Sequence, residues 1–165
     1  MTDNKSILSV GVTGTPGCGK TTFCNDSGFK VIDLNNYAES LGCLENTDNF
    51  GVREMDVERM TELWQSPTQL TLYDGHLAHH LPVDAIIVLR CEPEELRLRL
   101  ESRGYSESKV RENVEVEMLG GPWNDLVDDT RPIFEGTKGA IEWINNGCPI
   151  PVSYTHLTLP TNHPV

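Results

Sequence analysis

Positive charge is scarce in this chain, which carries 13 lysines and arginines against 25 aspartates and glutamates, for a formal net charge of -12. An acidic surface repels the phosphates of DNA and RNA, so we do not expect broad electrostatic binding of nucleic acid. The same surface would suit a basic protein partner. It would equally suit a protein that is merely soluble or adapted to salt, and the charge alone leaves both interpretations open.

Long hydrophobic runs are lacking too, since no stretch approaches the roughly 20 apolar residues that a membrane span needs. Residues 1–5 are polar and a β-rich run follows at once, which leaves no hydrophobic core of a signal peptide. The five cysteines form no Cys-x-x-Cys pair, and their odd number argues against a disulfide framework and a structural zinc site. We therefore expect a single domain in a reducing cytoplasm, without a membrane partner.

One segment carries a recognisable chemistry. Residues 14–21 read Gly-Thr-Pro-Gly-Cys-Gly-Lys-Thr and fit the phosphate-binding pattern GxxxxGK[ST]. Glycines let the backbone N–H groups turn toward a polyphosphate, while Lys20 is expected to reach the β- and γ-phosphates and Thr21 to hold Mg²⁺. A β-rich run over 6–13 precedes the loop, and a helix is expected to begin at Lys20, with its dipole toward the phosphates. This context argues against a chance glycine-rich turn.

Strands that alternate with helices predict an α/β protein, namely a three-layer P-loop domain with a parallel sheet of five strands. The predicted strands are 6–13, 29–33, 70–74, 85–90 and 132–135. The predicted helices are 20–28, 35–44, 56–64, 92–102, 106–119 and 138–145, with a loop at 45–50 and a break at 120–123.

The last residues, 149–165, do not read as part of this domain, because they carry four prolines, little charge and no periodicity. Within them, 151–161 resembles a translated sequencing-adapter read-through of the kind that ends some predicted proteins. We expect this tail to be foreign, with the native C-terminus missing and the domain spanning 1–148. His156 and His163 are therefore given no role.

Chemistry-bearing side chains follow the third predicted strand. Asp74 ends it, at a place where nucleotide-binding folds put a carboxylate for Mg²⁺; a turn cap is the alternative. His76 could orient or deprotonate a water, or hydrogen-bond a phosphate. His79 and His80 extend a His-x-x-His-His cluster that suggests zinc, but no cysteine or acid completes it nearby. We expect these last two to be structural or on the surface.

Basic side chains gather in the predicted 92–119 helices. Phosphoryl transfer needs cations that stabilise the charge of the transferred group. Arg103 lies beside Gly104 at the junction of two predicted helices, where a lid could close, and it is the candidate. Arg97 and Arg111 are expected on solvated helix faces. Arg53, between the second and third strands, could bind a monophosphate, although a single loop arginine is commonly only a surface residue.

Together these segments resemble one family, the archaeal and eukaryotic adenylate kinases of the isoenzyme-six (CINAP) type within the P-loop nucleoside monophosphate kinases. The resemblance covers about residues 6–145. Within them, this chain departs from the family in two places: the helix after the phosphate loop is shortened, and residues 120–130 fit the family pattern poorly. The resemblance is carried by the runs 14–22, 31–34, 74–76, 87–90 and 99–105, and by Glu112-Asn113. It implies a broad-specificity kinase with ATPase activity, and a role in maturing small-subunit ribosomal RNA through a small-subunit ribosomal protein.

The resemblance also implies roles for individual residues. Arg103 would be the lid arginine, and Asp74 with His76 would match an Asp-x-His strand end. Lys138 would lie in the adenine loop, the monophosphate region would span 35–56 and the lid 102–112. The residues that would bind the ATP phosphates are Gly17, Gly19, Lys20, Thr21 and Thr22.

The sequence leaves three possible functions open. The first is transfer of the γ-phosphoryl of ATP to AMP, with Mg²⁺. The second is a ribosome assembly factor that hydrolyses ATP with a water held at His76, its kinase activity being incidental. The third is a kinase of another small acceptor such as shikimate, which is disfavoured because no arginine follows Asp33 before Arg53.

Overall fold

Five short strands form one parallel sheet in the computed structural model, which describes residues 6–45 and 53–150. Their order across the sheet is β2-β3-β1-β4-β5, and the prediction of a five-stranded parallel sheet is confirmed. The strands are β1 (Ser9–Thr13), β2 (Lys30–Asp33), β3 (Thr71–Asp74), β4 (Ala85–Val88) and β5 (Ile133–Glu135).

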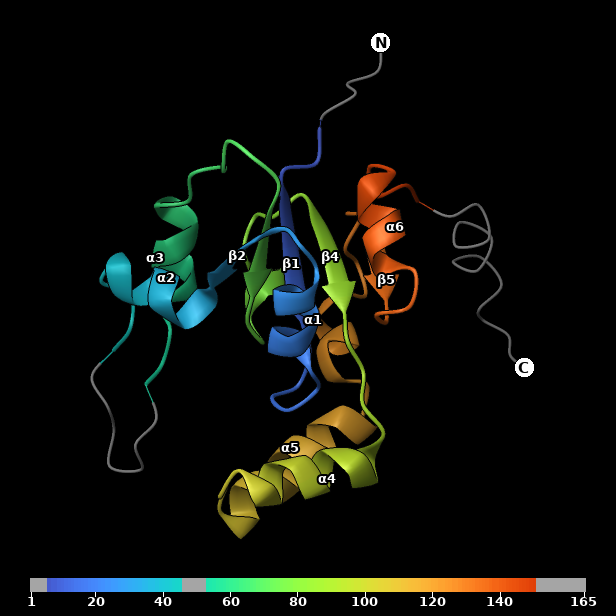
Figure 1. Ribbon diagram of the computed structural model, residues 1–165. Coiled ribbons are helices and arrows are strands. Elements are labelled where there is room, and N and C mark those ends of the chain that lie inside the picture. Colours follow the sequence, from blue (N-terminus) through green and yellow to red (C-terminus); the bar gives the residue numbers. More distant parts are fainter. Residues whose placement is uncertain (1–5, 46–52, 151–165) are drawn as a thin grey trace.

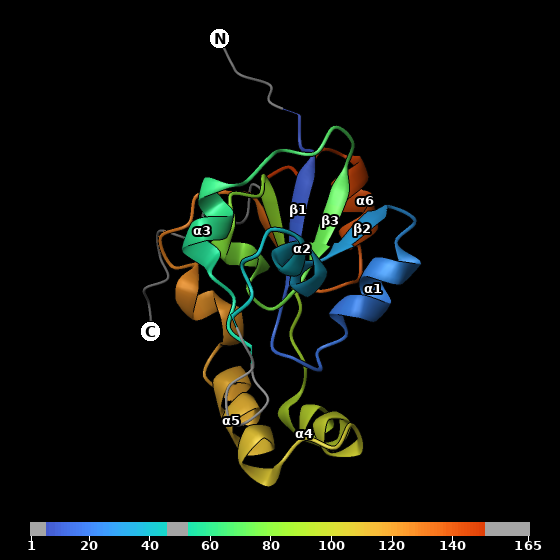
Figure 2. The same ribbon diagram turned by 90° about the vertical axis from the view of Figure 1, so that its left-hand side faces the viewer.

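Helices cover both faces of the sheet, which confirms the three-layer α/β fold (Figures 1 and 2). On one face lie α1 (Lys20–Asp26) and α6 (Ala140–Asn145); on the other lie α2 (Leu34–Ser40) and α3 (Val57–Glu62). All four lie where the sequence predicted helices, within a few residues at each end.

The side chains of the strands alternate between two hydrophobic cores, because successive residues of a strand point to opposite faces. Val10 and Val12 of β1 pack with Ile87 and with Trp143 of α6. Tyr73, Ile86 and Val88 pack in the second core with Leu34 of α2 and Met60 of α3. The three central strands, β1, β3 and β4, are thereby buried on both faces, as expected for a parallel sheet, whereas the edge strands β2 and β5 are partly exposed.

Two further helices, α4 (Pro93–Ser102) and α5 (Glu107–Met118), form a hairpin beyond the carboxyl ends of the strands (Figure 1). Their start signals are local. The Glu92 carboxylate accepts the Glu95 N–H with Pro93 at the first position, and the Ser106 hydroxyl accepts the Lys109 N–H. The tip of this hairpin contains most of the predicted lid, 102–112.

Two short 3₁₀ helices were not predicted, η1 (Ala78–His80) and η2 (Gly121–Asp125). The expected break at 120–123 is the start of η2, since Gly120 turns the chain with a positive φ of 115° and its carbonyl accepts the Trp123 N–H. No described helix is long and apolar enough to cross a membrane. Residues 46–52 of the predicted monophosphate region, and 151–165 of the predicted foreign tail, lie outside the described residues.

Candidate active site

The phosphate-binding motif connects β1 to α1 as a tight loop at the carboxyl edge of the sheet. Gly17 and Gly19 adopt positive φ angles of 96° and 95°, a conformation that favours glycine. A Cβ on Gly17 would come within 2.8 Å of Leu96 Cδ1 on α4. The loop therefore packs directly against the α4–α5 hairpin, and the glycine is needed for that close approach as well as for the turn.

Lys20 reaches back over the loop. Its Nζ donates to the carbonyl oxygens of Gly14, at 2.9 Å, and Thr15, at 3.3 Å. Burial lowers the pKa of the Lys20 ammonium, and the Arg103 guanidinium adds to the lowering, whereas the Asp74 carboxylate opposes it. The ammonium is thus held at the centre of the loop, beside a carboxylate and facing an arginine.

Asp74 and Thr21 meet beside the lysine because β3 and β1 are neighbours, with Val12 paired to Asp74. The Thr21 hydroxyl donates to Asp74 Oδ2 at 2.9 Å. Asp74 is buried, and burial raises the pKa of its carboxyl against the opposing effects of Thr21 and Lys20. Gly75 lets the chain pass Leu34, since a Cβ there would lie 2.5 Å from Leu34 Cβ.

These side chains line one cavity of about 340 Å³. Arg103 faces it from the end of α4, and Asp33 and Asn35 from β2 and α2. The structure thus brings together most of the predicted site, including the following residues: Gly17, Gly19, Lys20, Thr21, Thr22, Asp74, His76 and Arg103. These positions span the chain from the first strand to the α4–α5 junction.

His76 lies between this phosphate cavity and a second one of about 700 Å³ beneath α5. Its ring remains open to the cavities, yet the surrounding protein, Lys20 and the two neighbouring histidines lower the pKa of His76 to about 4. The imidazole is therefore neutral at pH 7 and offers a lone pair.

A third cavity, of about 900 Å³, lies on the other side of the phosphate loop. Gly19, Thr22 and Arg103 line both it and the phosphate cavity, so the two are adjacent. Thr137, after β5, lines its rim. Lys138 follows Thr137, but its side chain is exposed and lines none of these three cavities.

Sequence reasoning missed a buried hub that joins the loop to the hairpin. Glu117 of α5 is 0% exposed, and its carboxylate accepts from the Thr15 hydroxyl at 2.6 Å, Arg90 Nε at 2.7 Å and the Cys91 N–H at 2.9 Å. Arg99 likewise donates to the Gly17 carbonyl at 3.0 Å. The sequence did contain one signal for this hub: a glutamate, Glu117, at a core-facing position of a predicted amphipathic helix.

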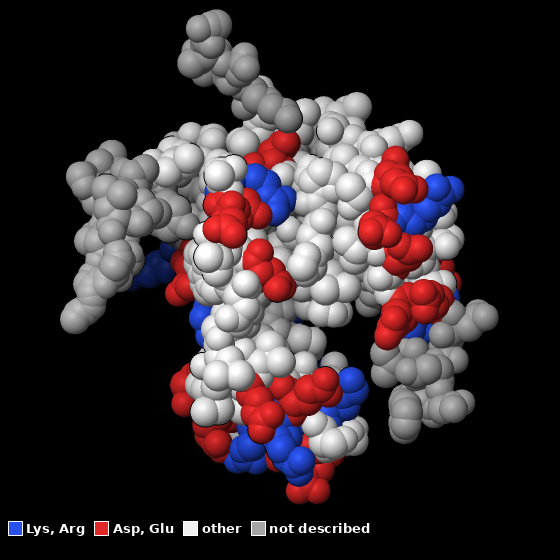
Figure 3. Space-filling view, turned by 180° about the vertical axis from the view of Figure 1, so that it is seen from behind, with Lys and Arg blue, Asp and Glu red and all other residues white. Residues whose placement is uncertain are grey.

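The other arginines of the hairpin take the places expected of them. Arg97 pairs with Glu94 and with Glu101 on the outside of α4, and Arg111 is exposed. Figure 3 shows how closely the basic and acidic side chains mix over the α4–α5 hairpin, which is the lower part of that view. Arg53 donates to the Glu45 carbonyl at 3.0 Å and lines none of the cavities above.

Comparisons with known proteins agree with this geometry. The family described as AAA domain matches residues 10–120. A protein of Pyrococcus abyssi named "Putative adenylate kinase" is 33% identical over 134 residues, 78% of this chain and 73% of the relative. A protein of the same name from Thermococcus kodakarensis is 38% identical over 134 residues, 78% of this chain and 75% of the relative.

A solved gluconokinase from Sinorhizobium meliloti has the same fold, with a TM-score of 0.52 at 14% identity over 96% of this chain and 99% of that one. At that identity the likeness concerns the fold alone.

Proposed function

We propose that this chain is a nucleoside monophosphate kinase. The chain belongs to the AAA domain family and to the family of the archaeal relatives just described. The reaction is transfer of the γ-phosphoryl of ATP to AMP, which yields two ADP. The finer assignment to the isoenzyme-six type, which rests on the sequence resemblance, is part of the same proposal.

One observation carries it. An ammonium, a guanidinium, a carboxylate and a hydroxyl converge on a single cavity that a glycine-rich loop borders, and they come from three separate segments of the chain. Phosphoryl transfer passes through a loose transition state with charge spread over the phosphoryl oxygens, so its catalysis is mostly positioning and electrostatic stabilisation. A site built from cations around a phosphate loop matches that requirement.

The two cavities divide the substrates. The 900 Å³ cavity between the loop and α4 would take the nucleoside of ATP, with Thr137 at its rim. The phosphate cavity continues toward Asp33 and Asn35, which open onto the proposed monophosphate region at 35–56. The lid at 102–112 would close over both, since Arg103 borders both cavities.

Thr21 and Asp74 fit Mg²⁺. Their two oxygens are the hard donors that this cation prefers, and the raised pKa of the buried Asp74 marks a carboxylate that a cation would stabilise. Bound Mg²⁺ supplies neutralisation of phosphate charge. Thr21 and Asp74 would hold it, the carboxylate directly or through water.

The remaining steps belong to the chain's own residues. Lys20 would leave the loop carbonyls and bind the β- and γ-phosphates. Arg103 would stabilise the charge of the phosphoryl group in the transition state of its transfer. No strong base is needed, because the attacking AMP phosphate is already an anion. His76, neutral at pH 7, would hydrogen-bond the reacting phosphate or a water.

The test is a coupled assay that compares ADP formed from MgATP with and without AMP. AMP-dependent formation of two ADP per ATP supports the kinase, and ADP formation that AMP does not change contradicts it. A complex with the bisubstrate dinucleotide Ap5A tests the division of the cavities. One adenosine in the 900 Å³ cavity and one toward Asn35 is the expected result.

The position of His76 supports a second candidate, an ATP-hydrolysing ribosome assembly factor. A neutral imidazole at the junction of two cavities can hold a water against a phosphate. The acidic charge would suit a basic ribosomal protein in the cytoplasm. His76→Ala separates the two: loss of AMP-independent hydrolysis with transfer retained favours the assembly factor, and equal loss of both favours one shared site.

A further inference from the structure

Two histidines and an aspartate meet outside the proposed kinase residues. His79 and His80 lie on η1, and Asp125 ends η2, 46 residues after His79. Asp125 Oδ2 is 2.9 Å from His79 Nε2 and 3.3 Å from His80 Nε2. The three ligand atoms all lie within 4.8 Å of one another. The acid that the His-x-x-His-His cluster lacks in sequence is thus provided by the fold.

These separations are close to those in a tetrahedral zinc site. Zn²⁺ bonds to nitrogen and oxygen are about 2.0–2.2 Å long, which places neighbouring ligand atoms about 3.3–3.6 Å apart at tetrahedral angles. The pair of His80 and Asp125 already has such a separation, and the pair of His79 and Asp125 is shorter by a few tenths of an ångström. Small rotations of the His80 and Asp125 side chains, which lie partly in solvent, would make room for the ion.

The second nitrogen of His79 is positioned for the same purpose. Nδ1 lies 2.7 Å from the Thr13 hydroxyl, which has its own acceptor in the His76 carbonyl oxygen at 3.1 Å. Thr13 can therefore accept Nδ1–H, which would leave the Nε2 lone pair to bind a metal ion held with Asp125. In the other tautomer a proton sits between Nε2 and Asp125, and a metal ion would displace it. Ligating histidines commonly anchor their second nitrogen in this way.

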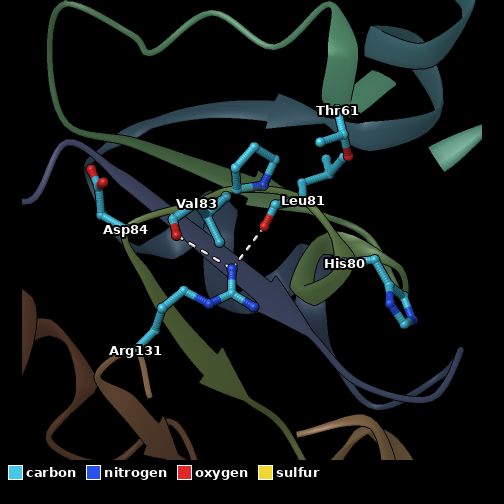
Figure 4. Close-up of a pocket in the computed structure, with 7 residues that line it drawn as sticks. Thr61, His80, Leu81, Val83, Asp84 and Arg131 are labelled. Atoms are coloured by element: carbon cyan, nitrogen blue, oxygen red, sulfur yellow. Dashed lines mark hydrogen bonds between the residues drawn. The ribbon is translucent and has the colours of Figure 1, made fainter. Parts of the chain in front are cut away.

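Arg131 holds the supporting turn in place. Its guanidinium donates to the carbonyls of Leu81, at 2.7 Å, and His79, at 2.8 Å, and it pairs with Asp129 at 2.6 Å. Figure 4 shows the guanidinium directed at the Leu81 and Val83 carbonyls, while the His80 imidazole points away from it. Asp129 balances the charge of the arginine, so the histidine turn is tied down without an uncompensated cation beside the cluster.

We propose that His79, His80 and Asp125 bind Zn²⁺, with a fourth position open to water. Two imidazoles and one carboxylate form a ligand set typical of three-residue zinc sites, and imidazole suits Zn²⁺ far better than Mg²⁺. The site is separate from the oxygen ligands Thr21 and Asp74. Its effect is to fasten η1 to η2, the two 3₁₀ segments that meet beneath the phosphate loop.

Calorimetric titration of the full chain with Zn²⁺, in excess Mg²⁺ and without nucleotide, tests the proposal. The proteins are wild type, His80→Ala, Asp125→Asn and the control Asp128→Asn, which makes the same charge change at an exposed residue three positions away. Wild type and the control should bind one equivalent. The other two should bind at least about tenfold more weakly, because even the loss of an outer partner of a metal ligand costs 10- to 100-fold.

Thermal unfolding gives an independent readout. Zn²⁺ should raise the midpoint of wild type and Asp128→Asn, and raise it less in His80→Ala and Asp125→Asn. His80 and Asp125 are both exposed, so neither variant should disturb the core. Failure of wild type to take up Zn²⁺, or equal uptake by all four proteins, overturns the proposal. So does a thiolate charge-transfer band when Co²⁺ replaces Zn²⁺, because it would place the ion on cysteines.

Discussion

The phosphate loop and the tip of the α4–α5 hairpin hold their cations in different ways. Lys20 bonds to two carbonyls of its own loop, next to the paired Thr21 and Asp74. Arg103 is exposed, and within residues 6–45 and 53–150 its guanidinium makes no hydrogen bond or ion pair. The loop is therefore organised before substrate binds, whereas the arginine is free to move. One half of the site depends on the fold, and the other on closure.

The largest effect on activity should come from substitution of Lys20 in the phosphate loop. Lys20→Ala removes the only cation at the centre of the described loop, and we expect it to abolish measurable AMP-dependent ADP formation. Lys30→Ala, at an exposed lysine of β2, is the matched control and should keep wild-type activity. Transfer at a wild-type rate in Lys20→Ala would place the chemistry elsewhere.

Substitution of Arg103 should lower the reaction rate greatly and leave the stability of the protein unchanged. Arg103→Ala is expected to lower kcat by about 10²- to 10³-fold, the usual loss when one stabilising donor is removed. Its urea unfolding should match that of wild type, because the side chain contacts little of the described protein. Arg111→Ala, an exposed arginine of α5, serves as the control. An Arg103→Ala enzyme with near wild-type kcat would remove the arginine from the mechanism.

Glu117→Gln should show the reverse pattern and so sharpen the comparison. The substitution weakens the bonds from Arg90, Thr15 and the Cys91 N–H to a fully buried carboxylate. We expect a loss of about 2 kcal/mol in unfolding free energy, as for hydrogen bonds to a charged group. Glu115→Gln, exposed two residues earlier, should change it little. Equal stability of the two variants would show that the hub does not join loop and hairpin.

The smallest effect concerns pH. His76 titrates at its ordinary pKa of 6.5 in the unfolded chain and at about 4 in the folded one. Between these values the unfolded chain binds more protons at this residue, so stability falls as the pH decreases from 6.5 to 4. Urea unfolding across this range should show a shallower fall for His76→Gln than for wild type. An identical slope would mean that His76 is as open to water as an unfolded histidine.

Local pattern was sufficient for most of the fold. The GxxxxGK[ST] motif lay between a β-rich run and a helix, and each predicted strand carried its own apolar pattern, so the sheet and the loop could be read from neighbouring residues. Asp74 and Arg103 could be chosen because each stands at the end of an element. Helix ends and strand ends at one edge of a parallel sheet meet in space.

The remaining parts depend on contacts between distant residues. Thr15 and Glu117 are 102 positions apart, and nothing local to either marks the other. Asp125 completes the histidine cluster only because η2, which begins in the break predicted at 120–123, brings it back beside η1. Lys138 was assigned by resemblance, and its role stays a prediction because the residue is exposed and lines none of the three cavities described above.

The contact between Gly17 and Leu96 has a consequence for exchanging parts among relatives. A larger residue at position 17 would be strained by the positive φ of 96°, and its Cβ would press on the side chains of Leu96 and Leu100 in α4. An α4–α5 hairpin taken from another kinase would therefore have to be introduced together with the phosphate loop that packs against it. The natural unit of recombination in this protein is that pair of segments, although the chain separates them by more than 70 residues.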